Sequence, residues 1–98
     1  MSILTAEDIQ ARLPDVPTWE LFEGALRRSY AFKDFIESMT FVLKVAFLAE
    51  QADHHPDIVI NSSRVTLTLS THSVGGITEK DFALAKQINA IESPLPQQ

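Results

Sequence analysis

The clearest structural signal in this chain is residues 34–53, DFIESMTFVLKVAFLAEQAD. Apolar side chains recur there at spacings of three and four, which predicts a long helix with one buried face. The side chains predicted to face the core are Phe35, Met39, Val42, Leu43, Ala46 and Ala49. Val45 and Phe47 widen the apolar face, which indicates contact with another chain as well as with the home sheet. Pro56 sets the end, because the residue before a proline is pushed toward extended geometry.

Two hairpins flank this helix in the sequence. Residues 65–71 alternate apolar and polar side chains, with Val65, Leu67 and Leu69 predicted to face inward. They follow a short apolar run at 58–60 and a turn signal at 61–63. The earlier hairpin is predicted from strands at 18–23 and 26–32, joined by a turn at Gly24-Ala25. Arg28 shares a face with Leu26 by alternation, which is an unusual place for a charge.

Shorter helices are predicted near both ends of the chain. Residues 5–13 begin with Thr5 and Asp8 in a capping-box arrangement. Residues 78–91 begin with Thr78, and Ser93-Pro94-Leu95-Pro96 is predicted to end the fold. The order α-β-β-α-β-β-α predicts an α+β two-layer sandwich, with a four-stranded antiparallel sheet and three helices on one face. The length of 98 residues predicts a single domain over 1–98.

Composition narrows the classes of function. Apolar residues make up 45% of the chain, so a packed core is expected. The net charge is −5 and the basic residues are scattered, which argues against nucleic acid as a partner. The chain has no cysteine, so disulfides and thiolate chemistry are excluded. We find no signal peptide and no apolar run long enough to span a membrane, and therefore expect a cytoplasmic protein.

All three histidines fall between positions 54 and 72. Histidine transfers protons near neutral pH because its usual pKa is about 6.5. His54 and His55 lie where the long helix ends, and Glu50 precedes His54 by four residues. Each could be a helix-capping residue or a proton-transfer group, since both roles suit the negative end of a helix. His72 ends the alternating strand before a glycine-rich loop, which suits an exposed strand end or a pocket rim equally.

Other residue types in the sequence have structural explanations as well as functional ones. Asp81 stands three residues after Thr78, as in a capping box, and so favours a structural role. A tryptophan on a strand is usually a core residue, but Trp19 could form one wall of a site for a flat heterocycle.

A metal site is disfavoured, because the histidine spacing matches no familiar metal motif and adjacent histidines rarely reach one ion.

The pattern Glu50-x-x-x-His54-His55-Pro56, followed by His72 and Asp81, resembles the pterin-4a-carbinolamine dehydratases. Trp19, the Phe32-Lys33-Asp34-Phe35 entry to the long helix and the run from 65 to 81 are also similar to that family. The resemblance covers about residues 5–92. One position departs: the aromatic residue of the family pattern falls at Ser62, which predicts an altered pocket rim.

The resemblance implies an enzyme that dehydrates 4a-hydroxytetrahydropterin to quinonoid dihydropterin during tetrahydropterin recycling. By family analogy His54 and His72 are the acid–base pair, His55 orients the pterin, and Asp81 positions a histidine or a pterin amine. The further residues implied to bind substrate are Glu50, Asp53, Ser70, Thr71, Ser73 and Trp19.

The resemblance implies no metal and no separate cofactor. It also implies a homodimer or homotetramer, with Phe41, Val45 and Phe47 as candidate contacts. The alternative function is a non-catalytic binding or assembly module, like a transcriptional coactivator, on the same fold.

Overall fold

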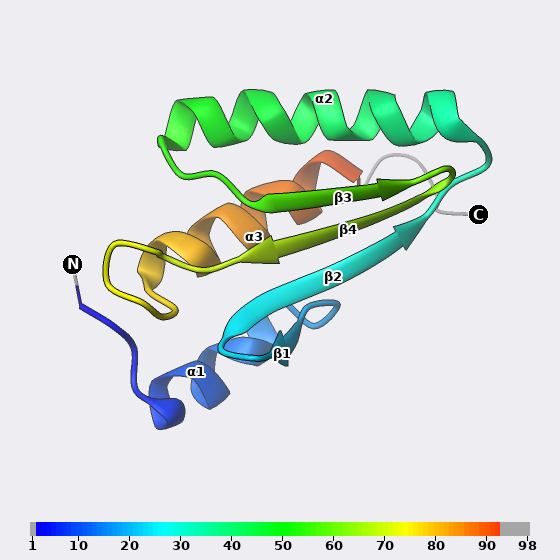
Figure 1. The fold of residues 1–98 in the computed structure, drawn as a ribbon. Coiled ribbons are helices and arrows are strands. Elements are labelled where there is room, and N and C mark those ends of the chain that lie inside the picture. Colours follow the sequence, from blue (N-terminus) through cyan, green and yellow to red (C-terminus); the bar gives the residue numbers. More distant parts are fainter. Residues whose placement is uncertain (1, 93–98) are drawn as a thin grey trace.

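The computed structural model of the chain describes residues 2–92 (Figure 1). The elements are α1 (Ala6–Arg12), the 3-10 helix η1 (Leu13–Asp15), β1 (Glu20–Phe22), β2 (Ala25–Ala31), α2 (Phe35–Ala52), β3 (Asp57–Asn61), β4 (Arg64–Leu69) and α3 (Glu79–Glu92). This succession confirms the predicted α-β-β-α-β-β-α order, with η1 added after α1. The predicted end of the fold at residues 93–96 lies outside the described residues.

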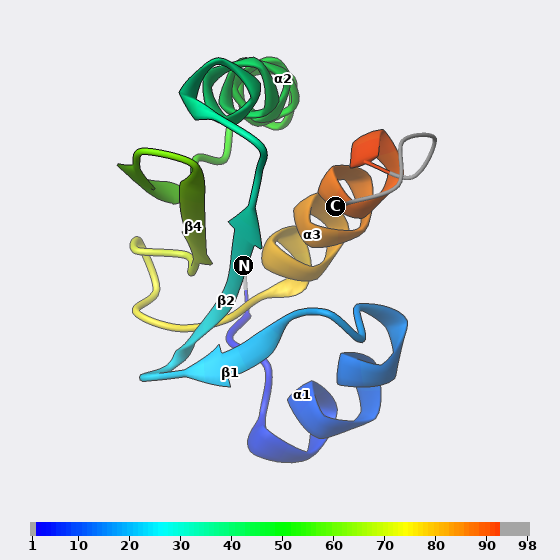
Figure 2. The same ribbon diagram turned by 90° about the vertical axis from the view of Figure 1, so that its right-hand side faces the viewer.

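The four strands form one antiparallel sheet in the order β1-β2-β4-β3. The β3–β4 pairing sets Ile58 opposite Leu67, and the β2–β4 pairing sets Leu26 opposite Leu69. Figure 2 shows α2 and α3 on the same side of this sheet, with α1 beside β1. The predicted two-layer α+β sandwich with its helices on one face is therefore confirmed.

The core lies between the sheet and these helices. Val65, Leu67 and Leu69 are fully buried, which confirms the alternation predicted for β4. Phe82 and Ile88 of α3 pack into the same cluster. Their burial stabilises the fold by roughly 2 kcal/mol for each large apolar side chain. None of the helices in residues 2–92 is long and apolar enough to cross a lipid bilayer.

The buried face of α2 differs from the predicted one. The structure buries Ser38, Phe41, Val45 and Ala49, whereas the side chains of Phe35, Met39 and Leu43 are 51%, 42% and 59% exposed. The predicted face was right for Ala49, which is buried, and for Val42, which packs against the core. It was wrong for Phe35, Met39 and Leu43, because apolar residues line more than one side of this helix and their period alone does not select the side that meets the sheet. Phe41 and Val45 are thus core residues rather than contacts with another chain, and Phe47 remains 67% exposed.

Arg28 does lie on the helix-facing side of β2, as alternation predicted. Its guanidinium group stands 4.3 Å from the ring centre of Tyr30. It also donates a hydrogen bond of 2.8 Å to Oδ1 of Asn89 on α3. The charge is therefore accommodated beside the core by an aromatic face and a helix side chain.

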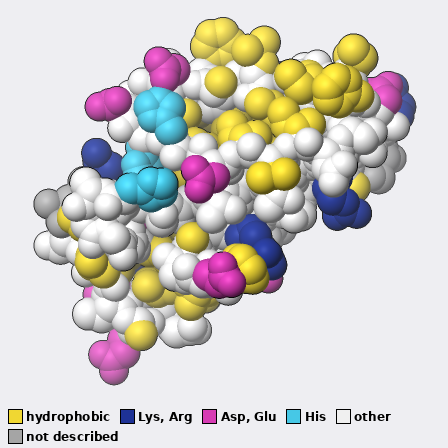
Figure 3. All heavy atoms as spheres, in the orientation of Figure 1, with side chains coloured by type: hydrophobic (Ala, Val, Ile, Leu, Met, Phe, Trp, Pro, Cys, Tyr) yellow, Lys and Arg dark blue, Asp and Glu magenta, His cyan; other side chains and the backbone are white. Residues whose placement is uncertain are grey.

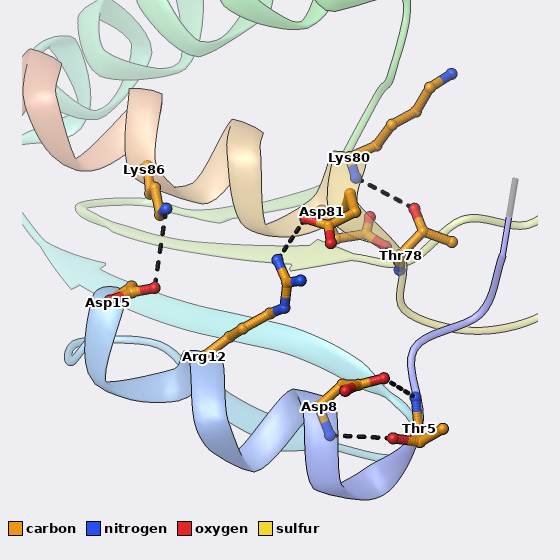
Figure 4. A network of polar contacts seen from close by, with 9 residues as sticks. Thr5, Asp8, Arg12, Asp15, Thr78, Lys80, Asp81 and Lys86 are labelled. Atoms are coloured by element: carbon orange, nitrogen blue, oxygen red, sulfur yellow. Dashed lines mark hydrogen bonds and ion pairs between the residues drawn. The ribbon is translucent and has the colours of Figure 1, made fainter.

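Helix α1 is fixed at its start and along its length. Thr5 and Asp8 make the predicted reciprocal capping box, with N···O distances of 3.1 and 3.2 Å (Figure 4). Arg12 pairs with Glu79 at the start of α3. These exposed contacts orient α1 against α3 and contribute little stability individually.

The β1–β2 turn consists of Glu23 and Gly24, one residue earlier than predicted, since Phe22 already pairs with Ala25. Both turn residues have positive φ, 48° and 77°. A type I′ hairpin turn requires this backbone, which suits the sequence Asn-Gly and strains a glutamate at the first position.

We expect Glu23→Asn to raise the free energy of unfolding by about 0.5–1 kcal/mol, because asparagine tolerates the left-handed region better. Urea denaturation of the variant beside the wild type measures this change. Glu23→Gln is the matched control: it removes the charge, keeps the strain, and should leave stability unchanged. Equal stability of the asparagine variant and the wild type would contradict the prediction.

Candidate active site

The end of α2 determines where the first two histidines point. Asp53 adopts the left-handed conformation, with φ 50° and ψ 43°, and ends the helix. The chain then continues through His54 and His55 into β3 without forming a helix or a strand. The side chain of His54 is 10% exposed, whereas that of His55 is 55% exposed.

His54 is held by a buried carboxylate from α3. Its Nε2 lies 2.6 Å from Oδ1 of Asp81, which is completely buried. The other carboxylate oxygen, Oδ2, accepts hydrogen bonds of 2.9 Å from the hydroxyl of Thr71 and from the backbone N–H of Thr78. The contact joins residues 27 positions apart in the sequence.

Asp81 therefore combines two roles that the sequence analysis considered separately. Its bond to the backbone of Thr78 is one half of a capping box at the start of α3, and Figure 4 shows where the two residues lie. The Thr78 hydroxyl accepts from Lys80 N at 3.2 Å. The remaining oxygen of the same carboxylate reaches His54. Sequence reasoning missed the Thr78 hydroxyl as a site group, because a threonine before a helix is already explained as a cap.

His72 is exposed and follows Thr71, the residue that bonds Asp81. The loop is closed by the bridge between Thr71 and Gly76, with Thr71 N donating to Gly76 O at 2.8 Å. Leu4 N donates to Ile77 O at 2.8 Å, so the N-terminal segment packs against the returning chain. Figure 3 shows the histidine side chains gathered at one end of the molecule.

The other predicted lining residues surround the same loop ends. Ser70 is half-buried at the end of β4, Ser73 is exposed in the loop, and Asp53 is exposed at the end of α2. Thr71 is buried, with its hydroxyl bonded to Asp81 and Thr78.

Glu50 pairs with a different histidine from the one expected. Its Oε2 lies 2.6 Å from Nε2 of His55, and both side chains are largely exposed. The expected helical contact with His54 required α2 to continue to residue 54. The helix ends at Ala52, and the left-handed turn at Asp53 directs His54 inward instead.

Ser62 lies away from this site. It belongs to the β3–β4 turn with φ 58°, at the opposite end of β3 from the histidines. The five residues of β3 span roughly 16 Å. The expectation that Ser62 alters a pocket rim is therefore wrong, because the hairpin carries this position to its far end.

Trp19 is a core residue with its indole N–H already engaged. It is 4% exposed and donates to Oδ1 of Asn89 at 2.9 Å. Asn89 follows Asp81 by eight positions on α3, which corresponds to about 12 Å along the helix. The structure thus shows no hydrogen bond from Trp19 to the histidines, and its role as a pocket wall stays a prediction.

The described part of the chain contains no group of three histidine or carboxylate side chains arranged to hold a metal ion. The arrangement instead offers one imidazole buried against a carboxylate, that of His54, and two exposed imidazoles, those of His55 and His72. Such a set can give and take protons.

Comparison with known proteins gives one consistent family. The family model described as pterin 4 alpha carbinolamine dehydratase matches residues 2–91. A relative from Thermomicrobium roseum, named for the same dehydratase, is 50% identical over 95% of this chain and 100% of its own. Relatives of that name from Mycolicibacterium smegmatis and Sulfolobus acidocaldarius are 48% and 46% identical, over 95% and 91% of this chain and 99% and 98% of theirs.

Solved structures share this fold. The crystal structure of a transcriptional coactivator/pterin dehydratase from Brucella melitensis matches with a TM-score of 0.87 and 37% identity over 92% of this chain and 98% of that one. A pterin dehydratase-like RuBisCO assembly factor shares the fold, with a TM-score of 0.61 and 24% identity over 76% of this chain and 87% of its own. The family match over residues 2–91, with relatives up to 50% identical over 95% of the chain, shows that this protein belongs to the pterin-4a-carbinolamine dehydratases.

Proposed function

We propose that this protein is a hydro-lyase that dehydrates 4a-hydroxytetrahydropterin to quinonoid dihydropterin in tetrahydropterin recycling. One observation carries the proposal: a buried histidine, His54, bonded to a buried carboxylate, at the end of the molecule where the other histidines gather. Membership of the dehydratase family supports the choice of substrate and reaction.

The reaction needs two proton transfers and no redox change. The bond between C4a and the hydroxyl oxygen breaks, and a proton delivered to that oxygen makes the leaving group water. The proton on N5 is removed, and its electron pair forms the C4a=N5 double bond. Two imidazoles on different sides of the pterin ring suit these transfers, since each exchanges protons near neutral pH. We assign them to His54 and His72.

The remaining residues would bind and orient the pterin. His55, paired with Glu50 at 2.6 Å, presents a polar edge beside the inward-pointing His54. Asp53, Ser70 and Ser73 offer hydrogen-bonding groups around the same loops. The proposal includes no metal and no organic cofactor, because neither proton transfer calls for one.

A second function has one observation in its favour. The Brucella melitensis protein is described as a transcriptional coactivator as well as a pterin dehydratase. A binding or assembly role on the same fold is therefore the alternative. If this alternative holds, the folded protein would show no dehydratase activity.

We expect His54→Ala and His72→Ala each to lower kcat/KM by roughly 10²–10⁴-fold, the usual scale of lost general acid–base catalysis. A stopped-flow assay that generates the 4a-hydroxytetrahydropterin in situ and follows its ultraviolet absorbance measures the rate. Ser62→Asn, in the distant turn, is the control and should retain wild-type activity. Full activity in both folded histidine variants would overturn the acid–base assignment.

We expect EDTA to leave the rate of dehydration unchanged, because proton transfer by imidazole requires no Lewis acid. The same stopped-flow assay, with and without chelator, checks this. A loss of activity that zinc restores would replace the proposed mechanism with a metal-assisted one.

The exposed face of α2 is the proposed contact between copies of the chain. Five large apolar side chains, spaced almost entirely by four, leave 42–72% of their surface exposed: Phe35, Ile36, Met39, Leu43 and Phe47. Figure 3 shows apolar atoms collected along the upper side of the molecule, where Figure 1 places α2. A row of large exposed apolar side chains along one helix of a small protein is typical of an interface. We therefore propose a homodimer or homotetramer joined through α2.

We expect light scattering to give the wild type a mass of at least twice the chain mass of 10.9 kDa. Leu43→Glu and Phe47→Glu should reduce it to a monomer, because burying an unpaired carboxylate is costly. Lys44→Glu, on the same helix but outside the apolar stripe, is the control and should keep the wild-type mass. A monomeric wild type would exclude this contact.

A further inference from the structure

The carboxylate of Asp81 accepts three hydrogen bonds in the core, and their directions can be derived. An ionised carboxylate has acceptors only. When Asp81 is ionised, its partners all donate: Nε2 of His54 at 2.6 Å, the hydroxyl of Thr71 at 2.9 Å and the backbone N–H of Thr78 at 2.9 Å. The residue itself is completely buried.

The two threonine hydroxyls extend this series of hydrogen bonds, and each bond in it has the same direction. The hydroxyl of Thr71 has a single proton, and Asp81 receives it. In the 2.8 Å contact between Thr71 Oγ1 and Thr78 Oγ1, the proton must then come from Thr78. Thr78 Oγ1 in turn accepts the backbone N–H of Lys80 at 3.2 Å. Every link thus points toward the carboxylate, which is the arrangement in which successive bonds strengthen one another.

This direction determines the protonation pattern of His54. Because Nε2 donates to Asp81, the proton of the neutral ring resides on Nε2, and Nδ1 is left with a lone pair. Within the described residues Nδ1 of His54 has no hydrogen-bond partner. The buried side-chain atoms without a partner do not include it, so Nδ1 is not fully buried. It therefore lies where solvent or a ligand can reach it.

We propose that Thr71 and Thr78 are positioning residues: through Asp81 they hold His54 with Nε2–H directed inward, so that Nδ1 is the atom that exchanges a proton with the substrate. The claim that Nδ1 exchanges a proton with the substrate rests on the dehydratase function proposed above. The claim that Nε2 carries the inward proton does not, because the hydrogen bonds exist in the free protein. Thr71 thus acts through Asp81 and His54, rather than by using its hydroxyl to bind substrate.

The first test is the tautomer of His54, read from long-range ¹H–¹⁵N spectra at pH 8, where an ordinary imidazole is neutral. We expect wild type to show protonated Nε2 and bare Nδ1. We expect Thr71→Val, which removes the hydroxyl but keeps the shape, to shift the His54 ¹⁵N signals, because Asp81 loses one of the donors that orient it toward Nε2. Thr71→Ser should restore the wild-type signals. A wild-type ring protonated on Nδ1, or identical spectra for the valine variant, would overturn the proposal.

The second test separates positioning from substrate binding. We expect Thr71→Val to lower kcat about 10-fold with KM within about twofold of wild type, because the lost bond served a charged group rather than the ligand. Thr78→Val should lower kcat by less, since it is one link further away. Thr71→Ser should retain most of the wild-type kcat. A raised KM with unchanged kcat would make Thr71 a substrate-binding residue instead.

The two proposals fail in distinguishable ways. If wild type lacks dehydratase activity but shows the expected tautomer, and Thr71→Val shifts the His54 signals, the proposed function fails and the positioning network stands. If wild type is active and the His54 signals are unchanged by Thr71→Val, the function stands and the network is wrong.

Discussion

The pairing of β3 with β4 is the constraint on which the site depends. The two strands are antiparallel and joined by a two-residue turn, so the chain that enters β3 and the chain that leaves β4 emerge at the same end of the sheet. The entering chain carries His54 and His55, and the leaving chain carries Thr71 and His72. A shift of one residue in this register would turn Val65, Leu67 and Leu69 away from the core. The same apolar packing that stabilises the sheet therefore also aligns the histidine segments.

The buried Asp81 joins the helix layer to that arrangement. A carboxylate removed from water costs several kcal/mol unless donors surround it. Here the donors come from three separate segments: the end of α2, the end of β4 and the start of α3. The residue is thus a helix cap, a tie between layers and a partner of His54 at once. Because Asp81 is buried, loss of any of its donors leaves the carboxylate without one of its hydrogen bonds. Such a loss lowers the stability of the fold and also disturbs the position of His54.

Helix α2 has an apolar side that packs on the sheet and a second apolar side that is exposed. Val45 and Ala49 face the sheet, while Leu43 and Phe47 face away from it. Apolar side chains on both sides make a helix whose pattern fits more than one orientation. The sheet-facing side packs against β4 and α3, and Phe41 on that side lies against the rings of Tyr30 and Phe32. The remaining apolar side is left for contact with another molecule.

Local patterns in the amino-acid sequence were enough to specify the element order, the layer architecture, the capping of α1 and α3, and the clustering of the histidines. These follow from short-range physics: side-chain period, turn chemistry and caps involve residues only a few positions apart. The folded arrangement was needed to establish which face of α2 is buried, which histidine points inward, and that Glu50 pairs with His55 rather than His54. It also carried Ser62 to the far end of the hairpin and brought Asp81 to His54. Those outcomes depend on one left-handed residue and on contacts between distant segments, and no local pattern specifies how such segments meet.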